Sequence, residues 1–170
     1  MNIVSKFTIG SDEGIDNLFD VIRPSVSSLY KGLVPEEDIK NHILHLDRRK
    51  VINDLNDLSN QLIMSYQDDQ PIGYSILKTG SGYPGLSEEK RATELSFVIL
   101  QEYNSPEARQ SLWKKCRAAV AFTDVVWINM LINDPLVDFL KESGFSIAEE
   151  THSGPFQLPS YLLILEITKA

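Results

Sequence analysis

The sequence has few of the features that mark secreted, membrane-spanning or nucleic-acid-binding proteins. Its one cysteine, Cys116, excludes an internal disulfide. No apolar run approaches the roughly 20 residues of a membrane span, and the first residues lack the apolar core of a signal peptide. The formal net charge of -8 at pH 7 argues against nucleic acid as a partner, because phosphate binding needs a basic surface. We therefore expect a cytoplasmic protein without membrane or nucleic-acid contacts.

What is present is the composition of an ordinary globular domain. The chain has 170 residues, of which 42% are hydrophobic and 24% are charged. This length suits one domain over residues 1–170 and is a poor fit to two. Cys116 lies on an apolar helical face, so we expect it to pack in the core before it reacts as a thiol.

The most informative stretch runs from Glu94 to Phe145. The segment 94–100 is nearly all apolar, which is typical of a buried strand, and 125–132 is a second apolar strand. Between them Ser105 suits a helix N-cap and Pro106 suits the first helical position. A strand, a helix and a second strand form a βαβ unit, which predicts that the two strands are parallel.

The remaining segments predict further strands, helices and two loops. We expect strands over 3–9, 61–66, 72–77, 145–149 and 161–167, and helices over 15–26, over 35–58 and from Asn133 to Gly144. Pro24 should kink or divide the first helix. The segments 80–91 and 150–160 are predicted loops. This order predicts an α/β (α+β) fold with a mixed central sheet of six to seven strands and about four helices.

Three short motifs in this order resemble the GNAT superfamily of acetyl-CoA-dependent N-acetyltransferases. They are Asp69–Tyr74, Glu94–Tyr103, and Asn133 followed at the family's spacing by Phe139 and Gly144-Phe145. The resemblance implies acetyl-CoA as co-substrate and direct transfer of the acyl group to a primary amine. The acceptor would be a small molecule or a peptide, a homodimer is compatible with it, and no metal is assigned.

The resemblance also assigns roles to individual residues. Glu94 matches a general base, although it could equally be an ordinary polar residue at a strand end. Asn133 matches a contact of the cofactor arm, with a helix cap as the open alternative. Tyr83 and His152 are candidate substrate contacts, and both are also common as packing or surface residues. The other predicted cofactor-binding residues are Ile99, Leu100, Gln101, Asn104, Arg109 and Gln110.

Two departures from the family pattern motivate a second hypothesis. The family's (R/Q)xxGxG loop lets backbone amides approach a diphosphate at a helix N-terminus. Here Asn104 stands in the first position, and Glu107 and Arg109 replace the two glycines. Leu140 stands where many members carry a tyrosine that protonates the leaving thiolate. The alternative is therefore a catalytically inactive GNAT-fold binding or regulatory module.

Overall fold

The computed structural model describes residues 1–167, and the chain forms two compact units. The first unit comprises Met1–Ile76 and Phe97–Cys116, and the second comprises Leu77–Ser96 and the chain from Arg117 onward. The described residues hold eight strands and five α-helices, slightly more than the six to seven strands and about four helices predicted. No helix in this part of the chain is long and apolar enough to cross a membrane.

Four strands lie wholly or mostly in the first unit: β1 (Ile3–Thr8), β2 (Asn60–Gln67), β3 (Gln70–Thr79) and β5 (Val98–Ile99). β1 pairs antiparallel with β2, and β5 pairs antiparallel with β3. Asp68 and Asp69 join β2 to β3 and have φ values of 49° and 68°. Two successive residues with positive φ suit the tight turn of a hairpin.

The helical part of the first unit differs from the prediction in two places. α1 (Asp12–Tyr30) runs through Pro24, which does not divide it. The single helix predicted over 35–58 is two helices, α2 (Glu36–Leu44) and α3 (Arg48–Asn56). The break is explained by Asp47, whose side chain accepts a hydrogen bond from the Lys50 amide at 3.1 Å and so caps a new helix.

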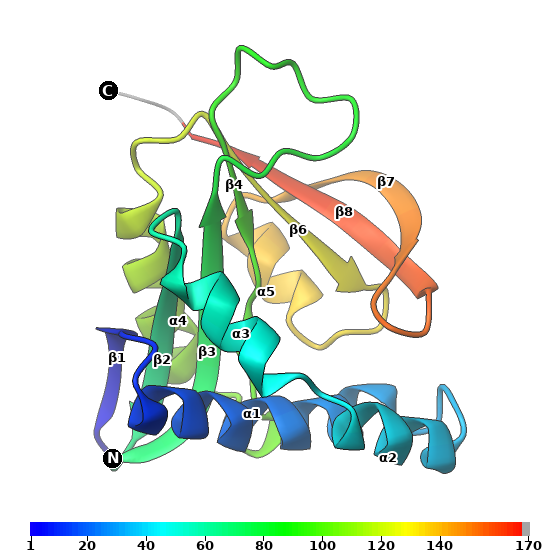
Figure 1. The fold of residues 1–170 in the computed structure, drawn as a ribbon. Helices are drawn as coiled ribbons and strands as arrows, with labels where there is room; N and C mark the ends of the chain where they lie inside the picture. The colour runs from blue at the N-terminus through cyan, green and yellow to red at the C-terminus, as the bar shows by residue number, and fades with distance from the viewer. Residues whose placement is uncertain (168–170) are drawn as a thin grey trace. The chain divides into compact units, whose positions relative to one another are not determined.

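The core of the first unit lies on both faces of its strands. Leu62 and Met64 of β2 pack with Leu18 and Val21 of α1, and Figure 1 shows α3 in front of β2 and β3 and α4 (Pro106–Ala119) behind them. Side chains alternate along a strand, so Ser65 points to the opposite face from Met64. Burying each of these apolar side chains contributes about 1.5–3 kcal/mol to folding.

Serine side chains tie α4 to the strands on that second face. Ser5 Oγ lies 2.7 Å from Ser65 Oγ and 2.8 Å from Ser111 Oγ of α4. Cys116 of the same helix is fully buried, as the apolar helical face predicts. A short 3-10 helix, η1 (Gln101–Tyr103), leads from β5 toward α4. The start of α4 is therefore held in a fixed register against the strands of its own unit.

The second unit is built on β4 (Ala92–Leu95), β6 (Val125–Leu131), β7 (Ser146–Ser153) and β8 (Leu158–Glu166). The end of β3 pairs antiparallel with β4, and β4 pairs parallel with β6, which confirms the predicted parallel pair. β6 and β7 both pair antiparallel with β8. The single strand predicted over 94–100 is two short strands, because β4 ends at Leu95 and β5 begins at Val98.

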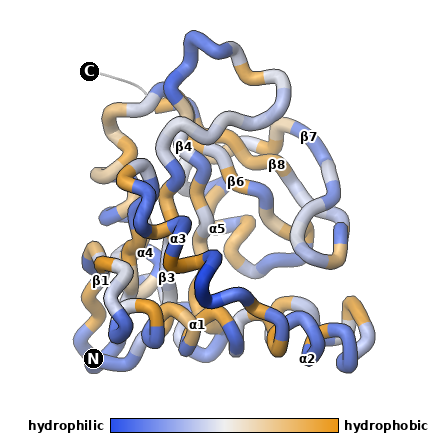
Figure 2. Tube along the Cα trace, viewed as in Figure 1, coloured by the Kyte–Doolittle hydropathy of each residue, from blue (hydrophilic) through white to orange (hydrophobic). Residues whose placement is uncertain are grey.

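The loop predicted over 150–160 is wrong, because most of it belongs to a hairpin. β7 and β8 extend to Ser153 and from Leu158, and His152 pairs with Pro159 in the register. Figure 2 shows hydrophilic residues along β7 and hydrophobic residues along the middle of β8. β7 is an exposed edge strand, so its side chains give no apolar alternation from which a strand could be predicted.

The second unit's helix, α5 (Val137–Glu142), ends as the sequence predicts. Gly144 has a φ of 111°, and its amide donates to Lys141 O at 3.1 Å. The Phe145 amide donates to Leu140 O at 3.0 Å. These two bonds are those of a Schellman cap, which needs a residue in a left-handed conformation and therefore favours glycine.

Candidate functional site

Glu94 lies in the short strand β4, and its carboxylate accepts a side-chain hydrogen bond within the second unit. In the register it stands between Lys78 of β3 and Trp127 of β6. Its Oε2 accepts a hydrogen bond from Ser81 Oγ at 2.9 Å. The side chain is half-buried. A carboxylate held in this way has one oxygen fixed by the protein and remaining lone pairs for a ligand.

The loop after β3 is anchored onto the sheet around this carboxylate. The Trp127 indole N–H donates to Ser81 O at 2.7 Å, and the Gly80 amide donates to Ala92 O at 2.8 Å. The rings of Tyr83 and Trp127 make an edge contact with centroids 5.9 Å apart. Ala92 and Glu94 are two residues apart on β4 and share one face, which this loop partly covers.

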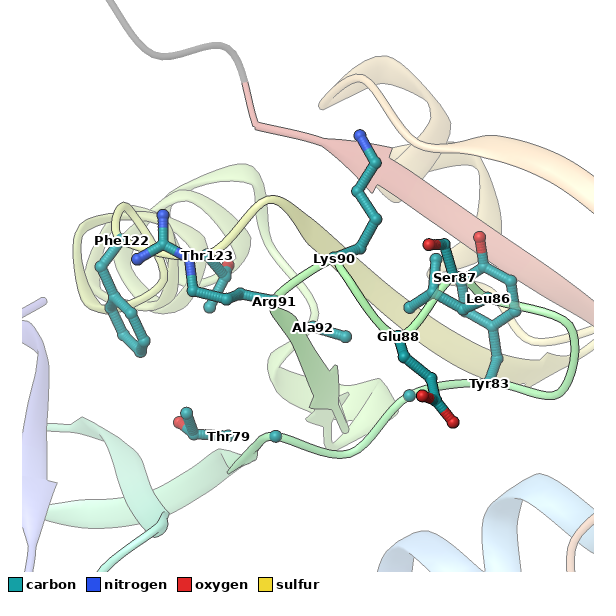
Figure 3. A pocket seen from close by; sticks show the side chains of 12 residues that line it. Thr79, Tyr83, Leu86, Ser87, Glu88, Lys90, Arg91, Ala92, Phe122 and Thr123 are labelled. Carbon is teal, nitrogen blue, oxygen red and sulfur yellow. The ribbon is translucent and has the colours of Figure 1, made fainter.

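A cavity of about 510 Å³ opens beneath the same loop (Figure 3). Its apolar lining includes the buried Ala92 of β4 and the side chains of Leu86 and Phe122. Gly80 and Gly82, which flank Ser81, also line it. The predicted substrate residue Tyr83 is therefore a wall residue of the cavity, and its ring contact with Trp127 links this wall to the strand pair that carries Glu94.

The rim of this cavity is charged. Figure 3 shows the Lys90 ammonium and the Arg91 guanidinium extending to one side of the loop and the Glu88 carboxylate extending to the other. Arg91 is paired with Asp124, with 3.6 Å between Nε and Oδ2. The cavity thus combines an apolar floor with charges of both signs at its mouth, a combination that suits a small polar organic molecule.

The parallel ladder beside Glu94 is short. It joins Ala92–Glu94 to Val125–Trp127, whereas β6 continues to Leu131. Beyond Trp127, the β6 residues pair with β8. Asn129 is the one exposed residue of β6 and lies on the same face as Trp127. The face of β6 that carries Trp127 and Asn129 therefore becomes accessible to solvent where the ladder with β4 ends.

The turn after β6 is held by the side chain of Asp134, and the N-cap of α5 is Leu136, which has no side-chain cap bond. Asp134 Oδ1 accepts a hydrogen bond from the Leu136 amide at 2.9 Å, and Asn133 is exposed. The alternative of a helix cap at Asn133 is wrong, and its contact with a cofactor stays a prediction. Burial raises the pKa of Asp134 from 3.8 to about 6, and the bond from Leu136 partly opposes this.

Two further residues of the second unit lie apart from Glu94's hydrogen-bonded neighbours. His152 is exposed on β7, in the hairpin rather than in a loop. Leu140 is fully buried in α5. A fully buried aliphatic side chain has no proton to donate, so nothing at position 140 can act as an acid.

In the first unit, the outer edge of β5 carries backbone groups that point away from β3. The Leu100 amide donates to Ile72 O of β3 at 2.9 Å, and Ile99 pairs with Gly73 in the register. Backbone groups alternate in direction along an antiparallel strand. The N–H and C=O of Ile99 therefore point away from β3. Of the three predicted residues Ile99, Leu100 and Gln101, only Ile99 therefore has both backbone groups on the outward edge, because Leu100 bonds to β3 and Gln101 begins η1.

The start of α4 is arranged differently, because its backbone amides donate within the chain. The amides of Tyr103, Asn104 and Ser105 donate to Leu100 O, Gln101 O and Tyr103 O at 2.9, 3.2 and 2.9 Å. Ser105 also accepts two bonds, from the Ala108 amide to its Oγ at 3.1 Å and from the Arg109 amide to its carbonyl at 3.0 Å. Pro106 has no N–H.

The side chains around the start of α4 also leave few groups for a ligand. Arg109 Nη1 donates to Asn104 Oδ1 at 2.8 Å and to Asn104 O at 3.4 Å. Glu107 is exposed in the first turn, where its negative charge already complements the helix dipole. Gln110 is exposed one residue after Arg109. These residues do not fit a diphosphate, which needs several free donors and no adjacent carboxylate.

Histidine, cysteine and carboxylate side chains form no metal-binding cluster in the described residues. Among residues 1–167, no three of them come close enough together to hold a metal ion. Sequence reasoning did not single out Ser81 or Asp134. Serine in a glycine-rich loop carries no signal of its partner, since the contact with Glu94 joins residues 13 positions apart.

Comparison with models of known protein families finds no match to this sequence, and comparison with curated proteins finds none either. The fold, in contrast, is shared with many solved structures. The paiA N-acetyltransferase of Thermoplasma acidophilum, solved with coenzyme A, has a TM-score of 0.74 and 18% identity over 98% of this chain and 99% of its own.

Two further structures give the same result. An aminoglycoside N(6')-acetyltransferase of Legionella pneumophila has a TM-score of 0.68 and 19% identity over 98% of this chain and 94% of its own. A GNAT-family acetyltransferase of Streptococcus agalactiae has a TM-score of 0.72 and 12% identity over 98% of this chain and 96% of its own. The resemblance inferred from three short motifs is therefore confirmed in its architecture, and this chain has the fold of the GNAT N-acetyltransferases.

Proposed function

We propose that this protein is an N-acyltransferase that moves an acyl group from a thioester directly to a primary amine. The observation that carries the proposal is the Glu94 carboxylate, held by Ser81 on the strand that forms the parallel pair. Structures with the same fold are acetyltransferases, and one of them was solved with coenzyme A. Acetyl-CoA is accordingly the first donor to test.

Glu94 acts as the general base in this proposal. A primary amine is protonated at neutral pH and must lose a proton before its nitrogen can attack a thioester carbonyl. The carboxylate takes that proton directly or through a water molecule. A C–N bond then forms, the nitrogen releases its second proton to solvent, and the C–S bond breaks. The sulfur leaves as a thiolate and takes its proton from solvent, because Leu140 offers none.

The cavity beneath the loop holds the acceptor in this proposal. Its floor residue Ala92 lies two positions before Glu94, on the same face of β4. Its wall residues Gly80 and Gly82 flank Ser81, which binds the Glu94 carboxylate. An amine whose body fills this space approaches Glu94 along one strand face. Tyr83 contacts the acceptor here, whereas a substrate role for His152 and a homodimer stay separate predictions.

The test is an assay of thiol release from acetyl-CoA over a broad panel of amines. The expected result is acylation of at least one amine, confirmed by mass, and its loss in Glu94→Gln. Absence of turnover with every amine, together with absence of acetyl-CoA binding by calorimetry, would reject the proposal. Acceptor binding is checked with Leu86→Ser, which should raise KM for the amine and leave KM for the donor unchanged.

The second candidate is a binding or regulatory module without catalysis. The start of α4 favours it, because Glu107 and the internally bonded amides oppose nucleotide binding. This candidate predicts no turnover in the native chain. It also predicts that replacing Glu107 and Arg109 with glycine creates coenzyme A binding that the parent lacks. Tight binding of coenzyme A by the unaltered protein would count against it.

A further inference from the structure

The two backbone regions that the sequence predicts as cofactor-binding are built differently in the first unit. In β5 the N–H and C=O of Ile99 point away from β3, so the ladder with that strand does not use them. The start of α4 is closed by its own hydrogen bonds. Coenzyme A has two chemically distinct ends, a pantetheine arm that carries the thioester and a nucleotide that carries a diphosphate. The two regions can therefore be compared separately with the two ends of a donor.

An arm of this kind suits the outer edge of β5. Pantetheine contains two amide groups and no charge, and it can add to a strand edge through N–H and C=O bonds as a further strand would. Ile99 supplies one donor and one acceptor on that edge. Ile99 and Leu100 are each 7% exposed, so the backbone there is a partly desolvated surface on which such bonds are stronger than in water.

The diphosphate, in contrast, has no comparable set of donors. Between Tyr103 and Arg109, five amides donate within the chain and Pro106 has none, which leaves the amide of Glu107. The carboxylate of Glu107 itself would repel a phosphate that approached this amide. Arg109 is the nearest cation, and its Nη1 already donates to Asn104 Oδ1 at 2.8 Å. A diphosphate that took more than the Glu107 amide would have to break some of these bonds first.

We infer that this protein recognises its donor by the pantetheine arm and gains little from the nucleotide. The donor class is therefore any acyl-pantetheine thioester, whether or not it carries an adenosine diphosphate end. This inference rests on the proposed function, because only an acyltransferase has an acyl donor. The binding preference that it predicts is nevertheless measurable without turnover. It assigns the outward edge of Ile99 to the arm and assigns a purely structural role to Ser105 and Asn104.

The first experiment compares the affinities of coenzyme A and pantetheine for the full chain by calorimetry, with amide chemical shifts recorded by NMR. The expected result is a pair of dissociation constants within about threefold of each other, since the nucleotide adds few contacts. Both ligands should shift the amides of Ile99 and Gln101 and leave those of Ser105 to Arg109 in place.

Coenzyme A binding at least about thirtyfold tighter than pantetheine, with shifted amides at Ser105 to Arg109, would overturn the inference. So would absence of pantetheine binding. Equal binding without acylation of any amine would uphold the inference and favour the binding module over the acyltransferase. Turnover of acetyl-CoA but not of acetyl-pantetheine would do the reverse.

The second experiment uses the double variant Glu107→Gly with Arg109→Gly, which removes the carboxylate and the bond to Asn104. Coenzyme A should then bind at least about tenfold more tightly than pantetheine, because amides at the helix N-terminus become approachable. Lys114→Gly, on the exposed side of the same helix, controls for the cost of glycine in a helix. An unchanged ratio in the double variant would show that these residues do not exclude the nucleotide, and would overturn the inference.

Discussion

The surroundings of Glu94 and the start of α4 are two places where the same family resemblance predicts function, and they are built in opposite ways. At Glu94 the protein directs a hydroxyl at a carboxylate and leaves a cavity of about 510 Å³ beneath the adjoining loop. At the start of α4 the backbone amides donate to acceptors within the chain. One fold thus holds a carboxylate by a single side-chain bond in one place and engages its backbone donors internally in another.

The largest expected effect tests the Glu94 side of this comparison. Glu94→Gln keeps the size of the side chain and a bond to Ser81 but removes the base, and should lower kcat by at least about 100-fold. Steady-state kinetics with the best amine measures it. Glu89→Gln, in the same loop region and outside the cavity lining, should leave kcat unchanged. A fully active Glu94→Gln would place the base elsewhere.

The next effect concerns a carboxylate that costs stability. The pKa of Asp134 is raised to about 6, so the unfolded chain releases this proton more readily than the folded one. Its contribution is unfavourable above pH 6 and vanishes below pH 4. Asp134→Asn should stabilise the protein by about 2 kcal/mol at pH 7.5 and by little at pH 4. Denaturant unfolding at both pH values measures this.

An equal gain for Asp134→Asn at both pH values would contradict the assignment, because it would mean that ionisation is not the cause. Asp138→Asn is the matched control. Asp138 is exposed in the first turn of α5, and its replacement should slightly destabilise the helix at pH 7.5.

A smaller effect sharpens the role of Ser81 as a positioning residue. Ser81→Ala removes the hydroxyl bonded to Glu94 and keeps the carbonyl that accepts from Trp127, so the loop should stay in place. We expect kcat to fall about tenfold with KM for the donor unchanged. Ser81→Thr should restore most of kcat. A drop in kcat that tracks lost thermal stability would instead indicate a structural role.

The smallest effect tests the closed side. Ser105→Ala removes the side-chain cap of α4 and should cost about 1 kcal/mol of stability, measured by urea unfolding. Ser59→Ala, at an exposed serine without a side-chain hydrogen bond, should cost nothing. If Ser105→Ala lowered kcat as strongly as Glu94→Gln, the comparison between an open and a closed region would be wrong.

The sequence predicted those parts of the fold that depend on local pattern. The apolar strands around Glu94 and Val125 were found as a parallel pair, and Gly144 was found as the residue that ends α5. The sequence-based prediction failed where no apolar pattern marks the structure. A short polar side chain, Asp47, divides one expected helix into two, and an exposed edge strand, β7, carries no apolar alternation.

The candidate site was predictable by residue type but not by arrangement. Glu94 and Tyr83 were identified from their positions in the chain, whereas Ser81 was not, because its partner is specified only by how the loop folds back. The substitutions at positions 107 and 109 were visible in the sequence. That the surrounding amides already donate to carbonyls and to Ser105 follows only from the coordinates.

The lone cysteine has a practical consequence for every assay above. Cys116 is fully buried, and burial raises the pKa of its thiol to about 12, so it is both shielded and protonated under assay conditions. Disulfide reagents that detect a released thiol should therefore report product alone while the protein stays native. The same chromogenic reaction, followed in denaturant, should count one equivalent per chain and time the opening of the first unit.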